Sequence, residues 1–307
     1  MTRSTAVHVV VLAAGQGTRM KSGVPKVLHR VANRSMIEWV LAAARDLTPE
    51  TLTVVVGHGA DAVRAGLTHV EGLSFVLQEP QLGTAHALRQ AEPVLQGRQG
   101  TVVLLSGDVP LLKASTLQAL VRHHVESGAA ATVLTALVER PRGYGRVVRI
   151  NGRIARIVEE RDASAEEREI REINTGIYAL DLAPLFQALS TIASENAQQE
   201  YYLTDLIAIY REREQRLETV LVEDASEVKG VNSRAELADM SSVARAAKNA
   251  ALMASGVTLV DPSATYIDSD VVIGQDTVIH PNVTIEGHTR IGSGVEIRSH
   301  VRIADSE

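Results

Sequence analysis

Two glycines and two basic residues lie close together near the amino terminus, at Gly15, Gly17, Arg19 and Lys26. Glycine has no Cβ, so Gly15 and Gly17 can take a positive φ and let a ligand approach the backbone N–H groups. Arg19 and Lys26 place positive charge beside the loop, which suits the oxygens of a phosphate. The spacing predicts a phosphate-binding loop in which Arg19 and Lys26 act on the bound group.

Two well-known phosphate motifs nearly match this stretch, and both fail at Met20. The dinucleotide fingerprint needs a third glycine where Met20 stands, and the Walker A pattern needs a glycine at the same position. A dinucleotide site and a P-loop ATPase are therefore not favoured. The alternative that the glycines form only a tight turn, with the two cations merely solvated, stays open.

A second candidate segment runs from Gln78 to Thr84. Gln78 and Gln81 offer amide donors and acceptors that suit the polar edge of a base, and Gly83 precedes a predicted helix. An ordinary loop with Thr84 as the helix N-cap explains the same residues equally well.

A carboxylate, Asp108, follows the most apolar predicted strand, Val102–Leu105. At the carboxyl end of a strand and facing a phosphate, it would be a suitable Mg²⁺ ligand. The competing interpretation is a turn or helix-capping aspartate.

A hairpin is predicted around Asn151-Gly152, because this dipeptide joins two apolar-alternating runs. Several polar or small residues fall at the ends of the neighbouring strands: Tyr144, Gly145, Glu159 and Asn174. Their carboxylate and amide groups could hydrogen-bond sugar hydroxyls, although each taken alone also fits a turn.

The segments that would position these loops alternate between strand and helix. Strands are predicted at Val7–Leu12, Thr51–Val56, Phe75–Leu77, Val102–Leu105 and Ala131–Thr135. Helices are predicted at Met36–Asp46, Asp61–Leu67, Thr84–Leu95 and Ser115–Glu126. This order favours an α/β domain with a Rossmann-like, mostly parallel sheet, helices on both faces and ligands at the carboxyl ends of the strands.

The carboxyl-terminal tail has a different pattern. Isoleucine recurs every six residues, at Ile267, Ile273, Ile279, Ile285, Ile291, Ile297 and Ile303. A strict hexapeptide period predicts a short left-handed parallel β-helix, with three hexads to a coil. Before it, Ser233 and Glu236 form a predicted capping box that opens a long helix ending near Ser255. The predicted domains are residues 1–232, a linker helix at 233–256 and the start of the β-helix at 257–307.

Composition narrows the possible classes of protein. The chain has 307 residues, is 45% apolar and carries a net charge of −6, which argues against nucleic acid or an anionic membrane as a partner. Cysteine is absent, which excludes a thiolate metal site or nucleophile. The apolar run after Ala6 leads directly into the glycine loop and is not expected to be a signal peptide. A cytoplasmic location is therefore expected.

The motifs together resemble those of one family. The stretch from Leu12 to Met20 with Pro25-Lys26 resembles the signature of sugar-1-phosphate nucleotidylyltransferases. The later motifs and the hexapeptide tail are similar in order to one branch, the bifunctional N-acetylglucosamine-1-phosphate uridylyltransferase / glucosamine-1-phosphate acetyltransferase. The resemblance covers essentially the whole chain. It implies a Mg²⁺-dependent reaction of UTP with N-acetylglucosamine 1-phosphate, giving pyrophosphate and UDP-N-acetylglucosamine, a cell-wall precursor.

The resemblance also implies roles for individual residues. The nucleotide would be bound by Leu12, Ala13, Ala14, Gly15, Gln78, Gln81, Gly83 and Thr84. The sugar would be bound by Gly107, Gly145, Glu159, Asn174, Thr204 and Asn232. Mg²⁺ would be bound by Asp108 and Asn232, while Arg19 and Lys26 would face the triphosphate. Some members have tyrosine where this chain has Ser106, a departure that leaves Gly107 and Asp108 intact.

The β-helix makes the larger departure from the family. The acetyltransferase site of the family lies in later coils, so that activity is expected to be absent from these 307 residues. A homotrimer is expected only for the full-length protein. Two rivals stay open: a thymidylyl- or uridylyltransferase for glucose 1-phosphate, and an acyltransferase or oligomerisation module built on the tail.

Overall fold

The computed structural model describes residues 6–307, and these residues divide into two compact units. The first contains the residues up to Leu28 together with Ile37–Gly230, and the second contains His29–Met36 together with Val231–Glu307. The predicted domain boundaries after residues 232 and 256 stay predictions. None of the helices in the described residues is long and apolar enough to cross a membrane.

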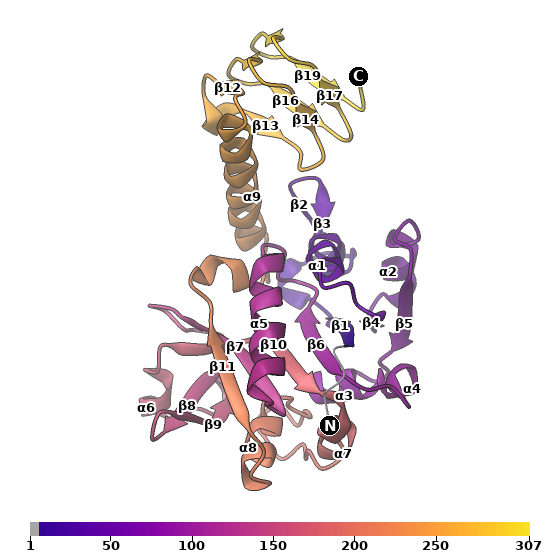
Figure 1. Cartoon of the computed structure of the whole chain (residues 1–307), viewed down its shortest axis with the longest axis vertical. Helices are drawn as coiled ribbons and strands as arrows, with labels where there is room; N and C mark the ends of the chain where they lie inside the picture. The colour runs from indigo at the N-terminus through magenta and orange to yellow at the C-terminus, as the bar shows by residue number, and fades with distance from the viewer. Residues whose placement is uncertain (1–5) are drawn as a thin grey trace. The chain divides into compact units, whose positions relative to one another are not determined.

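A mixed sheet forms the centre of the first unit (Figure 1). Its strands lie in the order β11-β7-β10-β6-β1-β4-β5, and β8 and β9 extend it beside β10. β1 is parallel to β4 and β6, and β4 is parallel to β5. β10 runs antiparallel to β6 and β7. The bounds are β1 Val7–Ala13, β4 Thr51–Val56, β5 Leu73–Leu77, β6 Thr101–Ser106, β7 Ala131–Leu137, β8 Arg146–Ile150, β9 Arg153–Val158, β10 Glu172–Asp181 and β11 Leu217–Leu221.

The valine run of β1 shows why the sheet is covered on both faces. Val9, Val10 and Val11 are all fully buried, and successive side chains point to opposite faces of a strand. Val9 and Val11 accordingly pack in one hydrophobic cluster and Val10 packs in another. A central strand buried on both faces is typical of a parallel α/β sheet. The predicted α/β fold is confirmed.

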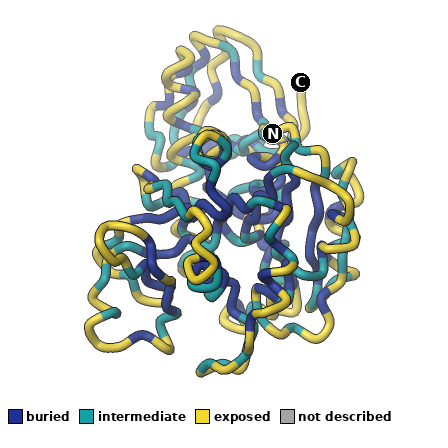
Figure 2. Tube along the Cα trace, turned by 60° about the horizontal axis from the view of Figure 1, so that its bottom comes forward, coloured by how far each residue is buried: buried dark blue, intermediate teal, exposed yellow. Residues whose placement is uncertain are grey.

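Helices supply the other half of each cluster. α1 and α5 pack on the side of Val9, whereas α3, α7 and α8 pack on the side of Val10. In Figure 2 the buried positions run through the interior of the trace and the exposed ones follow the outer loops. The bounds are α1 Met36–Arg45, α2 Ala60–Gly66, α3 Thr84–Arg89, α4 Glu92–Leu95, α5 Ala114–Ser127, α6 Ala165–Arg168, α7 Leu182–Leu189 and α8 Asp205–Glu212.

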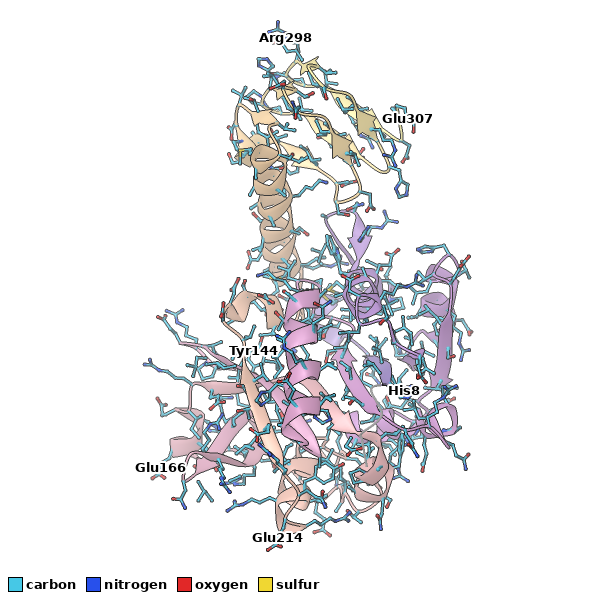
Figure 3. All side chains as sticks on the ribbon, in the orientation of Figure 1. His8, Tyr144, Glu166, Glu214, Arg298 and Glu307 are labelled. Carbon is cyan, nitrogen blue, oxygen red and sulfur yellow. The ribbon has the colours of Figure 1, made fainter. Side chains whose placement is uncertain are left out.

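The β8–β9 hairpin forms at the predicted Asn151-Gly152 turn. Asn151 takes a positive φ of 52°, as this type of turn requires. α6 follows the hairpin and begins with a capping box between Ser164 and Glu167. The side chain of Glu166 on α6 is exposed and projects outward from this part of the first unit (Figure 3).

Short parallel strands that repeat every 18 residues form the coils of the second unit (Figure 1). Ile267 pairs with Ile285, and Ile285 pairs with Ile303. An 18-residue step equals three hexads, so the predicted β-helix with three hexads to a coil is confirmed. The strands are β12 Thr258–Leu259, β13 Tyr266–Ile267, β14 Val272–Ile273, β15 Val278–Ile279, β16 Thr284–Glu286, β17 Arg290–Ile291, β18 Glu296–Ile297 and β19 Arg302–Ala304.

Isoleucine and threonine together fill the interior of these coils. Ile279 and Ile285 are fully buried, and Thr277 is buried with its hydroxyl donating to the carbonyl of Gly292 at 2.8 Å. A buried hydroxyl is tolerated because it has this partner. Arg298 and Glu307 lie on the exposed outside of the coils (Figure 3).

A helix and a small hairpin complete the second unit. α9 (Arg234–Ala254) begins at Ser233, whose hydroxyl accepts from the Glu236 N–H. The hairpin consists of β2 (Arg30–Val31) and β3 (Arg34–Ser35), and Arg34 forms an ion pair with Asp270 of the first coil. The remaining 3₁₀ turns are η1 Thr18–Met20, η2 Lys26–Leu28, η3 Ala225–Val228 and η4 Pro262–Ala264.

Two short turns, η1 and η2, follow the glycine loop and precede the hairpin. α1 then begins at Met36, where the next helix was predicted. Of the two glycines, only Gly17 has a positive φ, at 62°. Met20, which breaks both phosphate motifs, is 1% exposed and serves as a core residue.

Candidate functional site

A cavity of about 550 Å³ lies in the first unit at the carboxyl ends of β1 and β6. All eight residues predicted to bind a nucleotide line it, and so do Lys26 and Asp108. The eight are Leu12, Ala13, Ala14, Gly15, Gln78, Gln81, Gly83 and Thr84. Residues from three separate loops therefore meet at one place in the sheet, where α/β folds bind their ligands.

Gly17 sets the position of Lys26 within this cavity. Its φ of 62° is left-handed, and a Cβ on it would lie 2.6 Å from the Cβ of Lys26. Only glycine relieves both the strain and the clash. Lys26 therefore packs directly against the loop backbone, and its ammonium group donates to a carboxylate oxygen of Asp108.

The loop at residues 78–84, predicted to face a base, is held by a second segment of the chain, at Tyr201. The Tyr201 N–H donates to the Leu82 carbonyl at 2.8 Å, and the Tyr201 carbonyl accepts from the Ala85 N–H at 2.9 Å. Gly83 lies between these bonds with a φ of 105°. A Cβ there would lie 2.6 Å from the Tyr201 carbonyl oxygen. This close approach fixes the loop that carries Gln78 and Gln81.

A smaller cavity of about 260 Å³ is lined by Glu159 and Thr204. The Thr204 hydroxyl donates to Oε1 of Glu159 at 3.2 Å. Gly145 lies beside both Glu159 and Asn174: a Cβ on it would be 3.5 Å from Glu159 Oε1 and 3.6 Å from the Asn174 Cβ. The Asn174 N–H also donates to the Gly145 carbonyl at 2.9 Å. Four of the six predicted sugar-binding residues thus cluster together.

The carboxyl groups near the smaller cavity are electrostatically costly. Burial raises the pKa of Glu159, and the Thr204 hydroxyl bond opposes this shift. Burial also raises the pKa of Asp205, and the neighbouring Asp162 raises it further. Burial raises the pKa of Tyr202 to about 12. A neutral hydrogen-bonding ligand suits such a site better than an anionic one.

The other predicted site residues lie elsewhere. Gly107 is buried beside the end of β1, where its N–H donates to the Leu12 carbonyl at 2.9 Å. Arg19 is exposed in η1 and does not line the larger cavity, although Thr18 before it does. Asn232 belongs to the second unit, where its N–H donates to the Glu236 carboxylate at 2.6 Å.

Gly17, predicted as part of the phosphate-binding loop, also lines the larger cavity. Six further residues line it without having been predicted: Gln16, Thr18, Val27, Ala87, Ser106 and Glu200. Gln16 and Thr18 lie within the predicted loop, so their neighbours in sequence were the signal. Glu200 comes from a segment 116 residues beyond Thr84, and only the Tyr201 bonds bring it there. No local pattern in the sequence could have placed it.

Asp108 can serve as a ligand for a divalent cation. Its side chain is 23% exposed, lines the larger cavity and lies opposite the Lys26 ammonium group. Among residues 6–307 there is no group of three or more His, Cys, Asp or Glu side chains that could hold a metal alone. A single carboxylate fits a cation such as Mg²⁺, which is often held by one or two carboxylates plus substrate phosphates.

A family model covers most of the first unit. The MobA-like NTP transferase domain matches residues 9–222. The chain belongs to this family. A second model, the bacterial transferase hexapeptide with six repeats, matches residues 270–305 of this NTP transferase. The matched residues include strands β14 to β19.

Comparisons that cover nearly all of this chain agree with this assignment. The chain is 50% identical over 299 residues to the "Bifunctional protein GlmU" of Pelobacter propionicus, covering 97% of this chain and 65% of that protein. It is 48% identical over 302 residues to the protein of the same name from Brevibacillus brevis, covering 98% of this chain and 65% of that protein. The resemblance to the bifunctional branch is confirmed. The NTP transferase described here spans about two thirds of the length of these relatives.

Two solved structures share the fold. One is described as UDP-glucose pyrophosphorylase complexed with UDP-glucose and covers 78% of this chain at a TM-score of 0.60 and 18% identity. The other is a putative glucose-1-phosphate thymidylyltransferase from Bacillus anthracis, with a TM-score of 0.59 and 22% identity. At these identities the likeness shows the fold alone.

Proposed function

We propose that this NTP transferase transfers a uridylyl group from UTP to N-acetylglucosamine 1-phosphate, forming UDP-N-acetylglucosamine and pyrophosphate. The observation that carries the proposal is the convergence of three loops on one cavity. That cavity combines a glycine loop, a cation at Lys26, a carboxylate at Asp108 and two amides at Gln78 and Gln81. These are groups suited to a triphosphate, a divalent cation and a base.

The reaction needs positioning more than a protein nucleophile. A phosphate oxygen of the sugar ester attacks the α-phosphorus of UTP, and the bond to the bridging oxygen of pyrophosphate breaks. The attacking phosphate is already anionic, so no side chain has to be deprotonated first. Lys26 would neutralise charge that grows on the phosphates, as preorganised cations do in phosphoryl transfer. Arg19, which does not line the cavity, would add positive charge nearby.

We further propose that the divalent cation is Mg²⁺, held by Asp108 in the larger cavity of the first unit. When bound, it would supply charge neutralisation across the phosphates of both substrates. The chain's own contribution is to place the Asp108 side chain at the cavity, where it contacts the Lys26 ammonium group.

The smaller cavity supports the sugar end of the proposal. Glu159, Asn174 and Thr204 offer carboxylate, amide and hydroxyl groups within one cluster, with Gly145 leaving space beside them. A neutral sugar ring with several hydroxyls can use all three groups. The proposed partners are thus UTP and N-acetylglucosamine 1-phosphate.

Pyrophosphate release tests the proposal. The chain is incubated with Mg²⁺, each nucleoside triphosphate and a panel of hexose 1-phosphates that includes glucose 1-phosphate and N-acetylglucosamine 1-phosphate. Turnover should be highest with UTP and N-acetylglucosamine 1-phosphate. Preference for glucose 1-phosphate would overturn the sugar assignment, and preference for another nucleotide would overturn the base assignment.

A further inference from the structure

The side chain of His86 contacts Gln78, one of the two amides that face the proposed base. His86 lies on α3, one helical turn beyond the base-facing loop. Its Nδ1 is 3.2 Å from the Nε2 atom of Gln78. Neither the family pattern nor the reaction proposed above gives His86 a role.

The orientation of the Gln78 amide is determined by its other contact. Gln78 Nε2 lies 3.0 Å from the carbonyl oxygen of Gly83, and a carbonyl oxygen can only accept a hydrogen bond. The atom that faces Gly83 must therefore be the amide nitrogen. Its second hydrogen points to His86, so Nδ1 of His86 has to be an acceptor.

A neutral imidazole can accept at only one of its two nitrogens. The second nitrogen of His86, Nε2, lies 3.2 Å from the amide nitrogen of Gln90, so Gln78 and Gln90 cannot both donate to the ring. Gln78 is 3% exposed and would leave a buried N–H unpaired if it lost the contact. Gln90 is half-buried, and its Nε2 already donates to the His86 carbonyl oxygen at 3.0 Å, so it can give up the contact with the ring at less cost. The acceptor is accordingly assigned to Nδ1.

The surroundings keep the ring in this neutral form. Burial lowers the pKa of His86, and the positive charge of Arg89 on the same helix lowers it further. Tyr201, from the segment that clamps the base-facing loop, packs beside the ring with a centroid distance of 6.4 Å. A protonated ring would have no acceptor to offer Gln78.

With both amide hydrogens of Gln78 used inside the protein, its oxygen is the polar atom left for a ligand in the cavity. An amide oxygen accepts from the ring N–H of uracil or thymine. It does not pair with cytosine N3, which is itself an acceptor. We propose that His86 is a positioning residue that commits Gln78 to present its oxygen, and so makes the site select uracil or thymine nucleotides over cytosine nucleotides. This inference rests on the proposed function for its assignment of the cavity to the base.

Three substitutions separate this role from simple packing. His86→Asn places an amide oxygen near the position of Nδ1 and keeps the acceptor. His86→Gln places its polar group further out, near Nε2, and His86→Leu removes both. The readout is the ratio of kcat/KM for UTP to that for CTP with N-acetylglucosamine 1-phosphate. His86→Leu and His86→Gln should lower the ratio about tenfold, the size of effect expected when a buried donor loses its partner. In His86→Asn this ratio should stay within about threefold of its value in the unsubstituted protein, a much smaller change than the tenfold loss in the other two variants.

A purely structural role gives a different pattern. All three variants would then lose thermal stability while keeping the unsubstituted ratio of UTP to CTP, and that result would overturn the proposal. Melting temperatures measured in parallel show which variants are folded. A ratio that falls equally in all three folded variants, His86→Asn included, would also overturn it.

A binding experiment distinguishes failure of this inference from failure of the proposed function. Calorimetric dissociation constants for UTP and CTP, measured without sugar phosphate, do not require turnover. If the unsubstituted chain transfers no uridylyl group but binds UTP better than CTP, and His86→Leu removes that preference, the inference stands and the reaction is wrong. If the unsubstituted chain binds both nucleotides equally, the inference is overturned.

Discussion

The ammonium group of Lys26 and the carboxylate of Asp108 form an ion pair at the edge of the larger cavity, with side chains 13% and 23% exposed. The two residues are 82 positions apart in the sequence and come from different loops. Each neutralises the other in this structure. In the proposed reaction the substrate phosphates would bind Lys26 and a divalent cation would bind Asp108. Binding of either would therefore have to break the existing ion pair.

Replacing Lys26 removes a cation from the proposed phosphate site. Lys26→Ala should lower kcat/KM for pyrophosphate release by about 10²-fold or more, comparable to removing one transition-state donor. Arg122→Ala, an exposed cation on α5, is the matched control and should retain activity. Wild-type turnover from Lys26→Ala would remove this residue from the mechanism.

Replacing Asp108 tests the proposed metal site. Asp108→Ala should abolish the activation of turnover by added Mg²⁺, because the cavity loses the carboxylate that faces Lys26. Asp108→Asn keeps the shape of the side chain and should show the same loss, which separates charge from packing. A Mg²⁺ titration of pyrophosphate release measures the effect. If either variant reached the full rate, the cation would have to be bound elsewhere.

Local patterns predicted the sheet and the coils well because both depend on residues close in sequence. The valines of β1 identify a strand buried on both faces, and the six-residue spacing of isoleucine identifies the coils. The hairpin at residues 30–35 could not be predicted, because its contact with Asp270 joins residues more than 200 positions apart.

The candidate site was predictable to a similar extent. Its loops were identified from glycines, amides and a carboxylate, and the family resemblance supplied their order. The contact between His86 and Gln78 was not foreseen, since a histidine on a helix gives no sign of which amide it faces. The hydrogen bonds between Tyr201 and the loop around Gly83 were also not predicted. Backbone groups make them, and backbone pairing between distant segments cannot be recognised from residue types.

Gly83 should be intolerant of substitution. Gly83→Ala adds a Cβ 2.6 Å from the Tyr201 carbonyl oxygen at a φ of 105°. Left-handed strain alone costs about 1–2 kcal/mol, and the backbone clash should bring the loss of unfolding free energy above that value. Gly72→Ala is the control, because Gly72 has a φ of 72° but no atom within 4 Å of the added Cβ. Urea denaturation compares the two, and equal losses would contradict the clash.

Glu159→Gln should stabilise the protein near neutral pH. Burial raises the pKa of Glu159 above its ordinary value of 4.5, so the protonated carboxyl favours the folded state at low pH. That contribution is lost as the pH rises through the raised value, because the buried group then ionises. Glutamine stays neutral and still accepts from Thr204. The melting temperature of the variant should therefore exceed that of the parent at pH 7, with a gap that closes as the pH falls toward 4.5.

An exposed carboxylate provides the comparison for that experiment. Glu166 is exposed on α6, so Glu166→Gln should change the melting temperature little at either pH. The stabilised Glu159→Gln variant should nevertheless turn over more slowly with N-acetylglucosamine 1-phosphate, because a charged acceptor is lost from the proposed sugar cluster. A melting temperature equal to or below that of the parent at pH 7 would show that the Glu159 carboxyl is not destabilising.

The interior of the coils should depend on Ile285 more than on Ile303. Ile285 is fully buried between its two paired neighbours, whereas Ile303 is only partly buried. Ile285→Ala should destabilise the second unit by about 2–5 kcal/mol, the usual cost of removing a buried isoleucine side chain. Ile303→Ala should cost less.

Hydrogen exchange measures each unit separately: amides of β13, β16 and β19 should lose protection in Ile285→Ala, while those of β1 and β6 keep it. Equal protection of the coils in both variants would mean that Ile285 is not the core of this stack.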